Sequence, residues 1–239
     1  MKAMVFAAGL GSRLYPVTRN KPKALVEVAG KTMLEHTLLH LKEHGFTQVI
    51  INTHHFPGMI EQFVRENKAF GMEISFSREE KLLDTGGGLK KAAGFFCEDE
   101  PILVRNVDIL SDMDLGRMVR MHRHHSPLAT LLVSNRETSR YLLFDQQNRL
   151  CGWEHVKEGS QKIIREAASL QPMAFNGIHV IDPALLSLLP DKEVFSITEA
   201  YLEACKNHDI LALPDTSSYW FDIGTREKLE NARQFMSQR

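Results

Sequence analysis

The sequence predicts an α/β fold with a central mixed, mainly parallel sheet and a small antiparallel insertion. Short runs rich in valine, isoleucine and leucine alternate with amphipathic stretches, and this alternation is typical of βαβ units with parallel strands. The apolar runs are near-continuous, as expected for strands that are covered on both faces. The expected strands are 4–8, 48–52, 72–76, 102–104, 129–133, 141–145, 175–181 and 210–213.

Amphipathic patterns predict the helices. Leu34, Leu38 and Leu41 recur at helical spacing and give one apolar face, and Gly45 ends that helix. Further helices are expected at 59–67, 115–125, 183–189, 197–206 and 225–234.

The second half of the chain departs from this alternation. The strands expected at 129–133 and 141–145 lie close together, with the turn-like pair Ser134-Asn135 between them, which predicts the antiparallel insertion. The polar stretch 154–171 is expected to be a loop region. No repeat, low-complexity segment or linker interrupts the sequence, so we expect one domain over residues 1–239.

Composition excludes several classes of protein. The 239 residues are 43% hydrophobic and 25% charged, which is ordinary for a globular protein with a sizeable core. The formal net charge of -1 offers no basic excess to neutralise a nucleic acid. Cys97, Cys151 and Cys205 are scattered and form no CxxC pair, which disfavours a disulfide framework or a zinc site and fits reduced cytoplasmic thiols.

The apolar run at 4–8 is too short for the core of a signal peptide or for a membrane span, so we interpret it as a buried first strand. No later segment reaches membrane-spanning length. We therefore expect a cytoplasmic protein that has no membrane partner.

The most informative segment is the glycine-rich loop after the first strand. It reads Ala7-Ala8-Gly9-Leu10-Gly11-Ser12-Arg13-Leu14. Its small residues let a ligand approach the backbone, successive N–H groups can cradle phosphate oxygens, and Arg13 and Lys23 add fixed positive charge. The dinucleotide pattern GxGxxG would need glycine in place of Leu14, and the P-loop pattern would need glycine in place of Leu25. A lone Gly-x-Gly is more often a plain turn, but a plain turn does not explain the whole string.

The string Ala7-Ala8-Gly9-x-Gly11-x-Arg13-Leu14-x-Pro16-x-Thr18, followed by Lys21-Pro22-Lys23, resembles the signature of the sugar-1-phosphate nucleotidyltransferases. The resemblance implies a Rossmann-like three-layer sandwich. It also implies that Arg13 holds the departing β- and γ-phosphates and that Lys23 stabilises the α-phosphate during catalysis. The nucleotide-binding residues implied in this loop are Ala7, Ala8, Gly9, Leu10, Gly11, Ser12, Arg13 and Lys23.

A second glycine-rich segment, Asp84-Thr85-Gly86-Gly87-Gly88, resembles the family segment that closes over the nucleotide base. The resemblance implies that Thr85, Gly86 and Gly87 bind the nucleotide and that Gly88 binds the sugar. Without the resemblance, the segment is interpreted as a flexible turn that enters a helix beginning near Leu89.

Two aspartates are candidate ligands for a magnesium ion. Asn106-Val107-Asp108 resembles the Asn-Gly-Asp that ends a central strand in the family, where Asn106 would bind the nucleotide and Asp108 would be catalytic and bind Mg²⁺. Val107 stands where glycine is usual, which puts the local backbone conformation in question. Trp220-Phe221-Asp222-Ile223-Gly224-Thr225 resembles a later family segment in which the aspartate is the second metal ligand and the threonine opens the last helix. Mg²⁺ takes one or two carboxylates together with phosphate oxygens and water.

The sugar-binding side is less well marked. Phe175-Asn176-Gly177-Ile178 resembles the segment where family members contact the sugar, which implies that Asn176 bonds hydroxyl groups and that Gly177 allows close approach. Glu154 stands where a sugar-binding glutamate is often found, and the alternative is a solvated charge. The segment Asn52-Thr53-His54-His55 follows the second strand and is expected to face the site.

Other clusters are interpreted as structural. His122, His124 and His125 lie together at a helix end, where cationic side chains are favourable, and they lack the spacing of a metal site. The stretch with Arg117, Arg120 and Arg123 is interpreted as a solvated helix face.

The resemblance implies an enzyme that converts an NTP and a sugar 1-phosphate into an NDP-sugar and pyrophosphate with Mg²⁺. The resemblance also implies a nucleotide-binding half at about 1–112 and a sugar-binding half at about 113–239 within the one domain. The short chain and the triple glycine resemble N-acetylmuramate-1-phosphate uridylyltransferases most, which implies UTP. Mannose- or heptose-1-phosphate guanylyltransferases are the close alternative, and phosphocholine cytidylyltransferases share the first loop. A catalytically inactive nucleotide-binding regulatory module, marked by Val107, is the alternative of another class. Either a monomer or a homodimer is expected.

Overall fold

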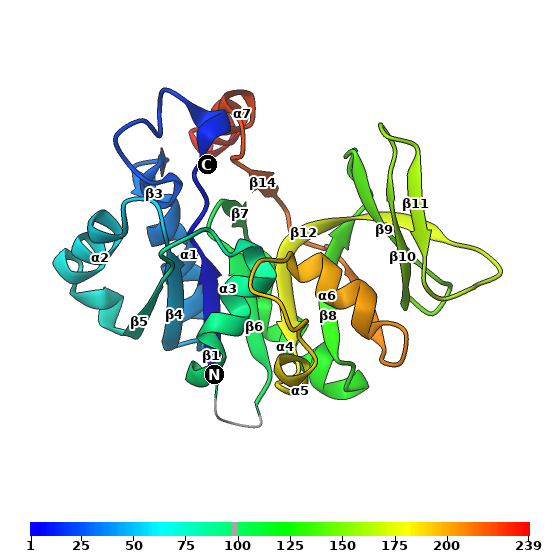
Figure 1. The fold of residues 1–239 in the computed structure, drawn as a ribbon. Helices are drawn as coiled ribbons and strands as arrows, with labels where there is room; N and C mark the ends of the chain where they lie inside the picture. The colour runs from blue at the N-terminus through cyan, green and yellow to red at the C-terminus, as the bar shows by residue number, and fades with distance from the viewer. Residues whose placement is uncertain (97–99) are drawn as a thin grey trace. The chain divides into compact units, whose positions relative to one another are not determined.

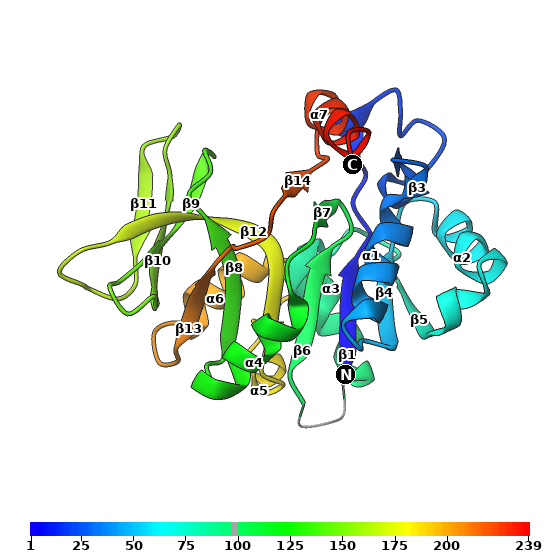
Figure 2. The ribbon, with the colours of Figure 1, turned by 180° about the vertical axis from the view of Figure 1, so that it is seen from behind.

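The computed structural model describes residues 1–96 and 100–239, and these fold into two compact units. Unit 1 consists of residues 1–82, 105–115 and 217–239, and unit 2 consists of residues 83–104 and 116–216. Figure 1 and Figure 2 show both units from opposite sides. The expectation of a single domain stays a prediction.

Unit 1 is built around three parallel strands. Strand β4 (Gln48–Thr53) pairs in parallel with β1 (Lys2–Phe6) and with β5 (Glu73–Arg78). The apolar residues of β1 and β4 are buried, as the near-continuous runs predicted. The connections between these strands contain helices α1 (Met33–Glu43) and α2 (Pro57–Glu66). This is the strand–helix alternation expected for the first part of the chain.

Short elements complete unit 1. Two antiparallel pairs were not expected from the sequence: β2 (Glu27–Val28) with β3 (Lys31–Thr32), and β7 (Ile109–Ser111) with β14 (Trp220–Asp222). The last helix is α7 (Arg226–Met236), and short 3₁₀ turns are η1 (Ser12–Leu14), η2 (Lys23–Leu25) and η3 (Lys68–Gly71). Leu14, Ile223 and Leu229 share one buried apolar cluster, which joins the glycine-rich loop to β14 and α7.

Two elements contain the points where the chain passes from one unit to the other. Strand β6 (Ile102–Asn106) ends in unit 1, and helix α4 (Leu115–His125) continues into unit 2. Both were expected from the sequence.

Unit 2 combines a mixed and an antiparallel arrangement. Strand β8 (Ala129–Ser134) is antiparallel to β12 (Gln171–Ile181) and parallel to β13 (Ile210–Pro214). Strands β9 (Arg140–Phe144), β10 (Leu150–His155) and β11 (Ser160–Ile163) follow one another in antiparallel pairs, and β9 also pairs with β12. The other helical elements of unit 2 are α3 (Asp84–Ala92), η4 (Ala93–Phe95), α5 (Ala184–Ser187) and α6 (Ile197–Ala204).

The predicted α/β class with parallel strands, a mixed arrangement and a small antiparallel region is confirmed. Besides the short pairs of unit 1, four details differ. Strand β10 was not expected from the sequence. The strands on either side of Ser134-Asn135 do not form a hairpin, because β8 pairs with β12 and β13 while β9 pairs with β10 and β12. The stretch expected to be a loop contains β11, whose residues are all exposed and therefore carry no apolar pattern. Helix α3 begins at Asp84 rather than near Leu89.

The cysteines agree with the expectation where they are described. Cys151 and Cys205 are buried free thiols, and Cys97 lies outside the described residues. Over residues 1–96 and 100–239, none of the helices has the length and hydropathy needed to span a membrane.

Candidate functional site

The glycine-rich loop of unit 1 is held by bonds to its own flanks. Gly11 has a φ of 67°, a conformation that favours glycine, and a Cβ there would lie 3.1 Å from Thr18 Cγ2 and 3.3 Å from Lys23 Cβ. The Thr18 hydroxyl donates to the Gly11 carbonyl oxygen over 2.8 Å. Thr18 therefore closes the loop from within, while Gly9 and Leu10 remain exposed at its tip.

A buried polar chain anchors the start of the loop. The Ala7 N–H donates to Asn52 Oδ1 over 2.8 Å, and Asn52 Nδ2 donates to Glu79 Oε1 over 2.6 Å. Asn52 and Glu79 are only 2% and 5% exposed. The segment after the second strand was expected to face the site, and Asn52 is shown to hold the loop instead of pointing freely outward. Glu79 was missed, because a single glutamate after a strand carries no signal in the sequence.

Lys23 and Asp108 form an ion pair in unit 1, with the Lys23 ammonium donating to Asp108 Oδ2. Both side chains are largely buried, at 12% and 21% exposure. Val107 takes no left-handed conformation, is buried, and donates its N–H to the Phe6 carbonyl oxygen over 3.1 Å. Valine is thus accommodated where the family usually has glycine, and Asp108 is still placed beside Lys23.

Asp222 lies on β14, opposite Ile109 of β7 in the antiparallel register. Its Oδ1 accepts the Gly224 N–H over 2.6 Å, and its Oδ2 accepts from Lys228 Nζ over 2.7 Å. Burial raises the pKa of this carboxyl, but the bond and charge of Lys228, the charge of Lys23 and the Gly224 N–H together outweigh burial and leave the pKa below its ordinary value. Thr225 caps α7 by accepting the Lys228 N–H, so the prediction that Thr225 opens the last helix is confirmed.

The two aspartates and Arg13 are neighbours. The Ile223 N–H donates to the Asp108 carbonyl oxygen over 3.1 Å, so the residue after Asp222 contacts Asp108 directly. A Cβ on Gly224 would lie 2.6 Å from Asp222 Oδ1 and 3.4 Å from Arg13 Nη2. Glycine at this position therefore leaves room for the carboxylate and the guanidinium to approach each other.

A buried arginine, Arg105, donates a hydrogen bond to the backbone of β7. Arg105 is 1% exposed, and it donates through Nη2 to the Ile109 carbonyl oxygen over 2.8 Å and through Nη1 to His40 Nδ1 over 2.9 Å. His40 Nε2 donates in turn to the Met113 carbonyl oxygen over 3.0 Å. Burial and the neighbouring Arg105 lower the pKa of His40 to about 3, so the imidazole is neutral and can accept from Arg105. No sequence pattern indicated this pair.

Asp108 and Asp222 suit a magnesium ion as a donor set. Asp222 lies on β14 near the Arg13 guanidinium, and Asp108 directly precedes β7, the strand that pairs with β14. Mg²⁺ takes one or two carboxylates while phosphates and water complete its shell. Over residues 1–96 and 100–239 no three His, Cys, Asp or Glu side chains gather as a full metal cage. The magnesium prediction therefore depends on a nucleotide to supply the other ligands.

In unit 2 the triple glycine lies inside helix α3 and is buried. A Cβ on Gly86 would lie 2.4 Å from the Phe195 ring, and a Cβ on Gly87 would lie 2.2 Å from the Glu193 carbonyl oxygen. The N–H groups of Gly86 and Gly87 donate to the Phe195 carbonyl oxygen over 2.9 and 3.2 Å. The interpretation as a flexible turn is wrong, because close packing against residues 193–195 accounts for these glycines. Contact of Thr85, Gly86, Gly87 and Gly88 with substrate stays a prediction.

Asn176 is the centre of a polar cluster in unit 2. Its Oδ1 accepts from Ser134 Oγ over 2.9 Å and from Arg136 Nε over 3.2 Å, and its Nδ2 donates to Asp215 over 2.7 Å. Asn176 is only 1% exposed. Ser134, Arg136 and Asp215 were not predicted, because they come from two segments, 134–136 and 215, that are distant from Asn176 in the sequence.

The other predicted sugar-binding residues lie near or beyond this cluster. Gly177 has a φ of 74° at a register shift between β12 and β8. Glu154 lies on β10, which is separated from β12 by β9, and it stands opposite Gln161 and Tyr141. The structure therefore keeps Asn176 and Gly177 together and puts Glu154 two strands away.

The interpretation of His122 as a helix-end cation is wrong: His122 is 2% exposed, contacts Thr130 Oγ1 through Nδ1 over 2.9 Å, and burial lowers its pKa to about 4.

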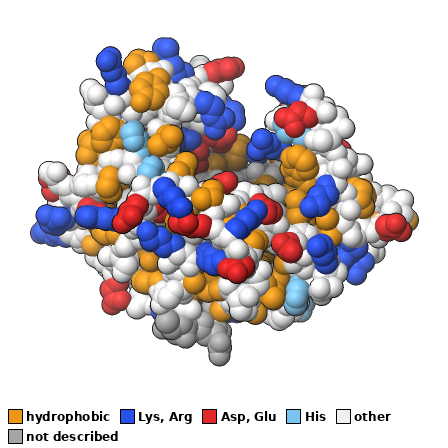
Figure 3. All heavy atoms as spheres, viewed as in Figure 1, with side chains coloured by type: hydrophobic (Ala, Val, Ile, Leu, Met, Phe, Trp, Pro, Cys, Tyr) orange, Lys and Arg blue, Asp and Glu red, His pale blue; other side chains and the backbone are white. Residues whose placement is uncertain are grey.

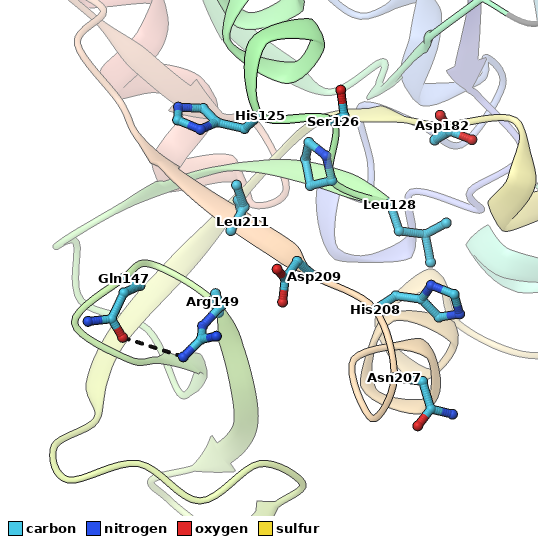
Figure 4. Close-up of a pocket in the computed structure, with 11 residues that line it drawn as sticks. His125, Ser126, Leu128, Gln147, Arg149, Asp182, Asn207, His208, Asp209 and Leu211 are labelled. Carbon is cyan, nitrogen blue, oxygen red and sulfur yellow. Dashed lines mark hydrogen bonds between the residues drawn. The ribbon is translucent and has the colours of Figure 1, made fainter.

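A cavity of about 670 Å³ opens beside His125, Arg149 and Asp209, and none of its lining residues is a predicted site residue (Figure 4).

Charged side chains do not gather into a basic patch on the face seen in Figure 3. Blue and red side chains are interspersed there, in keeping with the formal net charge of -1. This face offers no continuous basic surface of the kind that binds a nucleic acid backbone.

Comparisons with known proteins agree with the motifs. The family model described as "Nucleotidyl transferase" matches residues 2–239. Mannose-1-phosphate guanyltransferase beta-A of Xenopus laevis is 30% identical over 94% of this chain and 61% of its own length. UTP--glucose-1-phosphate uridylyltransferase of Synechocystis sp. is 29% identical over 82% of this chain and 53% of its own length. The chain thus spans little more than half the length of these curated relatives.

Among solved structures, HddC from Yersinia pseudotuberculosis matches with a TM-score of 0.77 and 19% identity, covering 98% of this chain and 99% of that one. This likeness supports the fold that the sequence predicted. The chain belongs to the nucleotidyl transferase family. This membership confirms the family that the glycine-rich loop resembles.

Proposed function

We propose that this chain transfers a nucleotidyl group from an NTP to a sugar 1-phosphate and releases pyrophosphate. The observation that carries the proposal is the arrangement in unit 1, where Lys23 is paired with Asp108 and the residue after Asp222 bonds to Asp108. A lysine, two carboxylates and a nearby arginine beside a glycine-rich loop are the groups that phosphoryl-type transfer requires.

The chemistry follows from charge and position. An oxygen of the sugar phosphate attacks the α-phosphorus, the bond from that phosphorus to the bridging oxygen breaks, and pyrophosphate leaves with the electron pair. Lys23 stabilises the negative charge on the α-phosphoryl oxygens, and Arg13 binds the departing pyrophosphate. Asp108 and Asp222 would hold Mg²⁺, which when bound supplies Lewis-acid stabilisation. The backbone N–H groups of the glycine-rich loop orient the nucleotide.

For the sugar side we propose the cluster around Asn176 in unit 2. Asn176 is buried and bonds to protein partners through both Oδ1 and Nδ2, so it orients Ser134, Arg136 and Asp215 rather than serving as the main contact itself. Polar groups that are held rigidly in this way are suited to select among sugar hydroxyl patterns.

The relatives favour a guanylyltransferase over the uridylyltransferase that the sequence motifs suggested first. Mannose-1-phosphate guanylyltransferases of Xenopus laevis and Dictyostelium discoideum each align with 94% of this chain, whereas the Synechocystis uridylyltransferase aligns with 82%. We therefore propose GTP and mannose 1-phosphate as the leading pair. UTP with N-acetylmuramate 1-phosphate is the second pair to test.

An inactive nucleotide-binding module is less well supported. The only sequence feature that indicated lost catalysis was Val107 in place of the usual glycine. Val107 is accommodated without a left-handed backbone conformation, and Asp108 keeps its lysine partner. The charged groups that catalysis needs are all present in unit 1.

Pyrophosphate release tests the proposal. The purified chain is incubated with Mg²⁺ and each pairing of GTP, UTP, CTP, ATP or dTTP with mannose, glucose or N-acetylmuramate 1-phosphate. We expect the highest rate with GTP and mannose 1-phosphate and a loss of that rate in Asp108→Asn. No release with any pair would contradict the transferase, and a higher rate with UTP and N-acetylmuramate 1-phosphate would reverse the order of the substrates.

A further inference from the structure

Lys228 is bound to the second predicted metal ligand, although no sequence motif marked it. Its ammonium lies 2.7 Å from Asp222 Oδ2. We propose that Lys228 is a positioning residue that occupies Asp222 before substrate arrives and thereby keeps the affinity of the free protein for a divalent cation low. This inference rests on the proposed function, because it takes Asp222 as a metal ligand.

The bonds to Asp222 fix its direction. Oδ1 accepts the Gly224 N–H over 2.6 Å, and Oδ2 is taken by Lys228. A cation that binds Oδ2 must therefore share that oxygen with a positive charge or displace it. The backbone bond to Oδ1 can persist in either case, so the carboxylate keeps its orientation while its partner changes.

The position of Lys228 in α7 argues that the pair is not a by-product of helix formation. Lys228 lies in the first turn of α7, three residues after the capping Thr225. A cation at a helix N-terminus faces the positive end of the helix dipole, which is unfavourable. Its carboxylate partner, rather than the helix, stabilises the ammonium at this place.

Lys228 is also able to move. Its side chain is 46% exposed, and the lysine ammonium is a compact charge on a flexible stem. The phosphate oxygens of an arriving nucleotide offer the ammonium a second anionic partner. Lys228 can then leave Oδ2 to the cation that accompanies the nucleotide, so cation binding is coupled to nucleotide binding.

Asp108 shows the same pattern with Lys23, which is more buried than Lys228. Both carboxylates are thus neutralised by lysines in the free protein. Lys228 is the informative one to change, because Lys23 is assigned a direct part in catalysis.

The test measures binding of Mn²⁺ alone to the full chain, without nucleotide, by calorimetry or by paramagnetic resonance. Lys228→Met should tighten Mn²⁺ binding by about tenfold, the order expected when a unit charge a few ångströms from a divalent ion is removed. Lys228→Arg should bind as the unaltered protein does. Arg226→Met removes a cation from the same exposed helical turn and should change the affinity by less than about twofold, because screening by solvent weakens unpaired surface charges.

Three results would overturn the inference. They are unchanged or weaker Mn²⁺ binding in Lys228→Met, an equal gain in Arg226→Met, and unchanged binding in Asp222→Asn. Circular dichroism checks that each variant is folded. The readout needs no turnover, so an absence of pyrophosphate release would contradict the proposed function while a tenfold gain in Mn²⁺ affinity would still support the role of Lys228.

Discussion

The backbone N–H of Ile223 donates to the carbonyl oxygen of Asp108 over 3.1 Å. Together with the antiparallel register that sets Asp222 opposite Ile109, this bond holds two segments that are far apart in the sequence on one pair of short strands. Both predicted metal ligands therefore take their positions from the same backbone contact.

Lys23→Ala should lower the rate constant kcat by about 10²- to 10³-fold, because one preorganised charge on the developing negative charge is lost. Asp108 also loses its ion-pair partner in this variant. Steady-state pyrophosphate release measures the effect. Lys31→Ala, a change at an exposed lysine on β3, is the matched control and should leave kcat within about twofold. A near-normal kcat for Lys23→Ala would remove Lys23 from the catalytic residues.

Asn52→Ala should weaken nucleotide binding by freeing the start of the glycine-rich loop. The variant removes the acceptor of the Ala7 N–H and the donor to Glu79, and each lost buried hydrogen bond costs about 1–3 kcal/mol. We expect the KM for the NTP to rise by about tenfold or more, a change of about 1.4 kcal/mol or above. Asn67→Ala removes an exposed asparagine bond on the same unit and should leave KM unchanged. An unaltered KM in Asn52→Ala would show that the loop keeps its shape without this anchor.

Gly87→Ala should destabilise the protein through steric overlap. The added Cβ would lie 2.2 Å from the Glu193 carbonyl oxygen, and backbone cannot move aside as cheaply as a flexible side chain. Overpacking of this kind costs about 1–3 kcal/mol, which corresponds to a fall in Tm of about 2–10 °C for a protein of this size. Thermal unfolding measures it. Gly94→Ala adds the same methyl group where no atom lies within 4 Å, and a similar fall in both variants would contradict the packing explanation.

Stability should decrease as the pH falls from about 6.5 towards 4. Burial lowers the pKa of His40 to about 3, of His179 to about 3 and of His122 to about 4. The unfolded chain, with histidine pKa values near 6.5, binds more protons than the folded protein in this window, so acid favours unfolding. Each of these histidines contributes up to about 1.4 kcal/mol per pH unit there.

Urea unfolding at pH 7.5, 6 and 5 measures this dependence. His122→Asn should flatten the slope between pH 6 and 5, because one of the three depressed groups is gone. His124→Asn changes an exposed histidine on the same helix and should leave the slope as it is. A flat profile in the unaltered protein would contradict neutral burial of the three histidines.

Much of the fold followed from the sequence, because apolar periodicity and capping act over a few residues. The runs at β1, β4 and β8 predicted strands, and the threonine at 225 predicted the start of α7. Strand β11 was missed, since its exposed polar residues carry no apolar alternation. Helix α3 was placed too late, because glycines are poor helix formers and only the contact with residues 193–195 explains them there.

The α/β class, the nucleotidyl transferase family and the candidates Lys23, Asp108 and Asp222 could be inferred from the amino-acid sequence, since these depend on local order along the chain. The partners of the site residues became visible only in the folded chain. Asn52 anchors Ala7, Lys228 binds Asp222, and Asn176 is bonded by side chains from two other segments. Hydrogen-bond and ion-pair partners are chosen by distance in the folded chain, and the spacing of residues in the sequence carries no record of that distance.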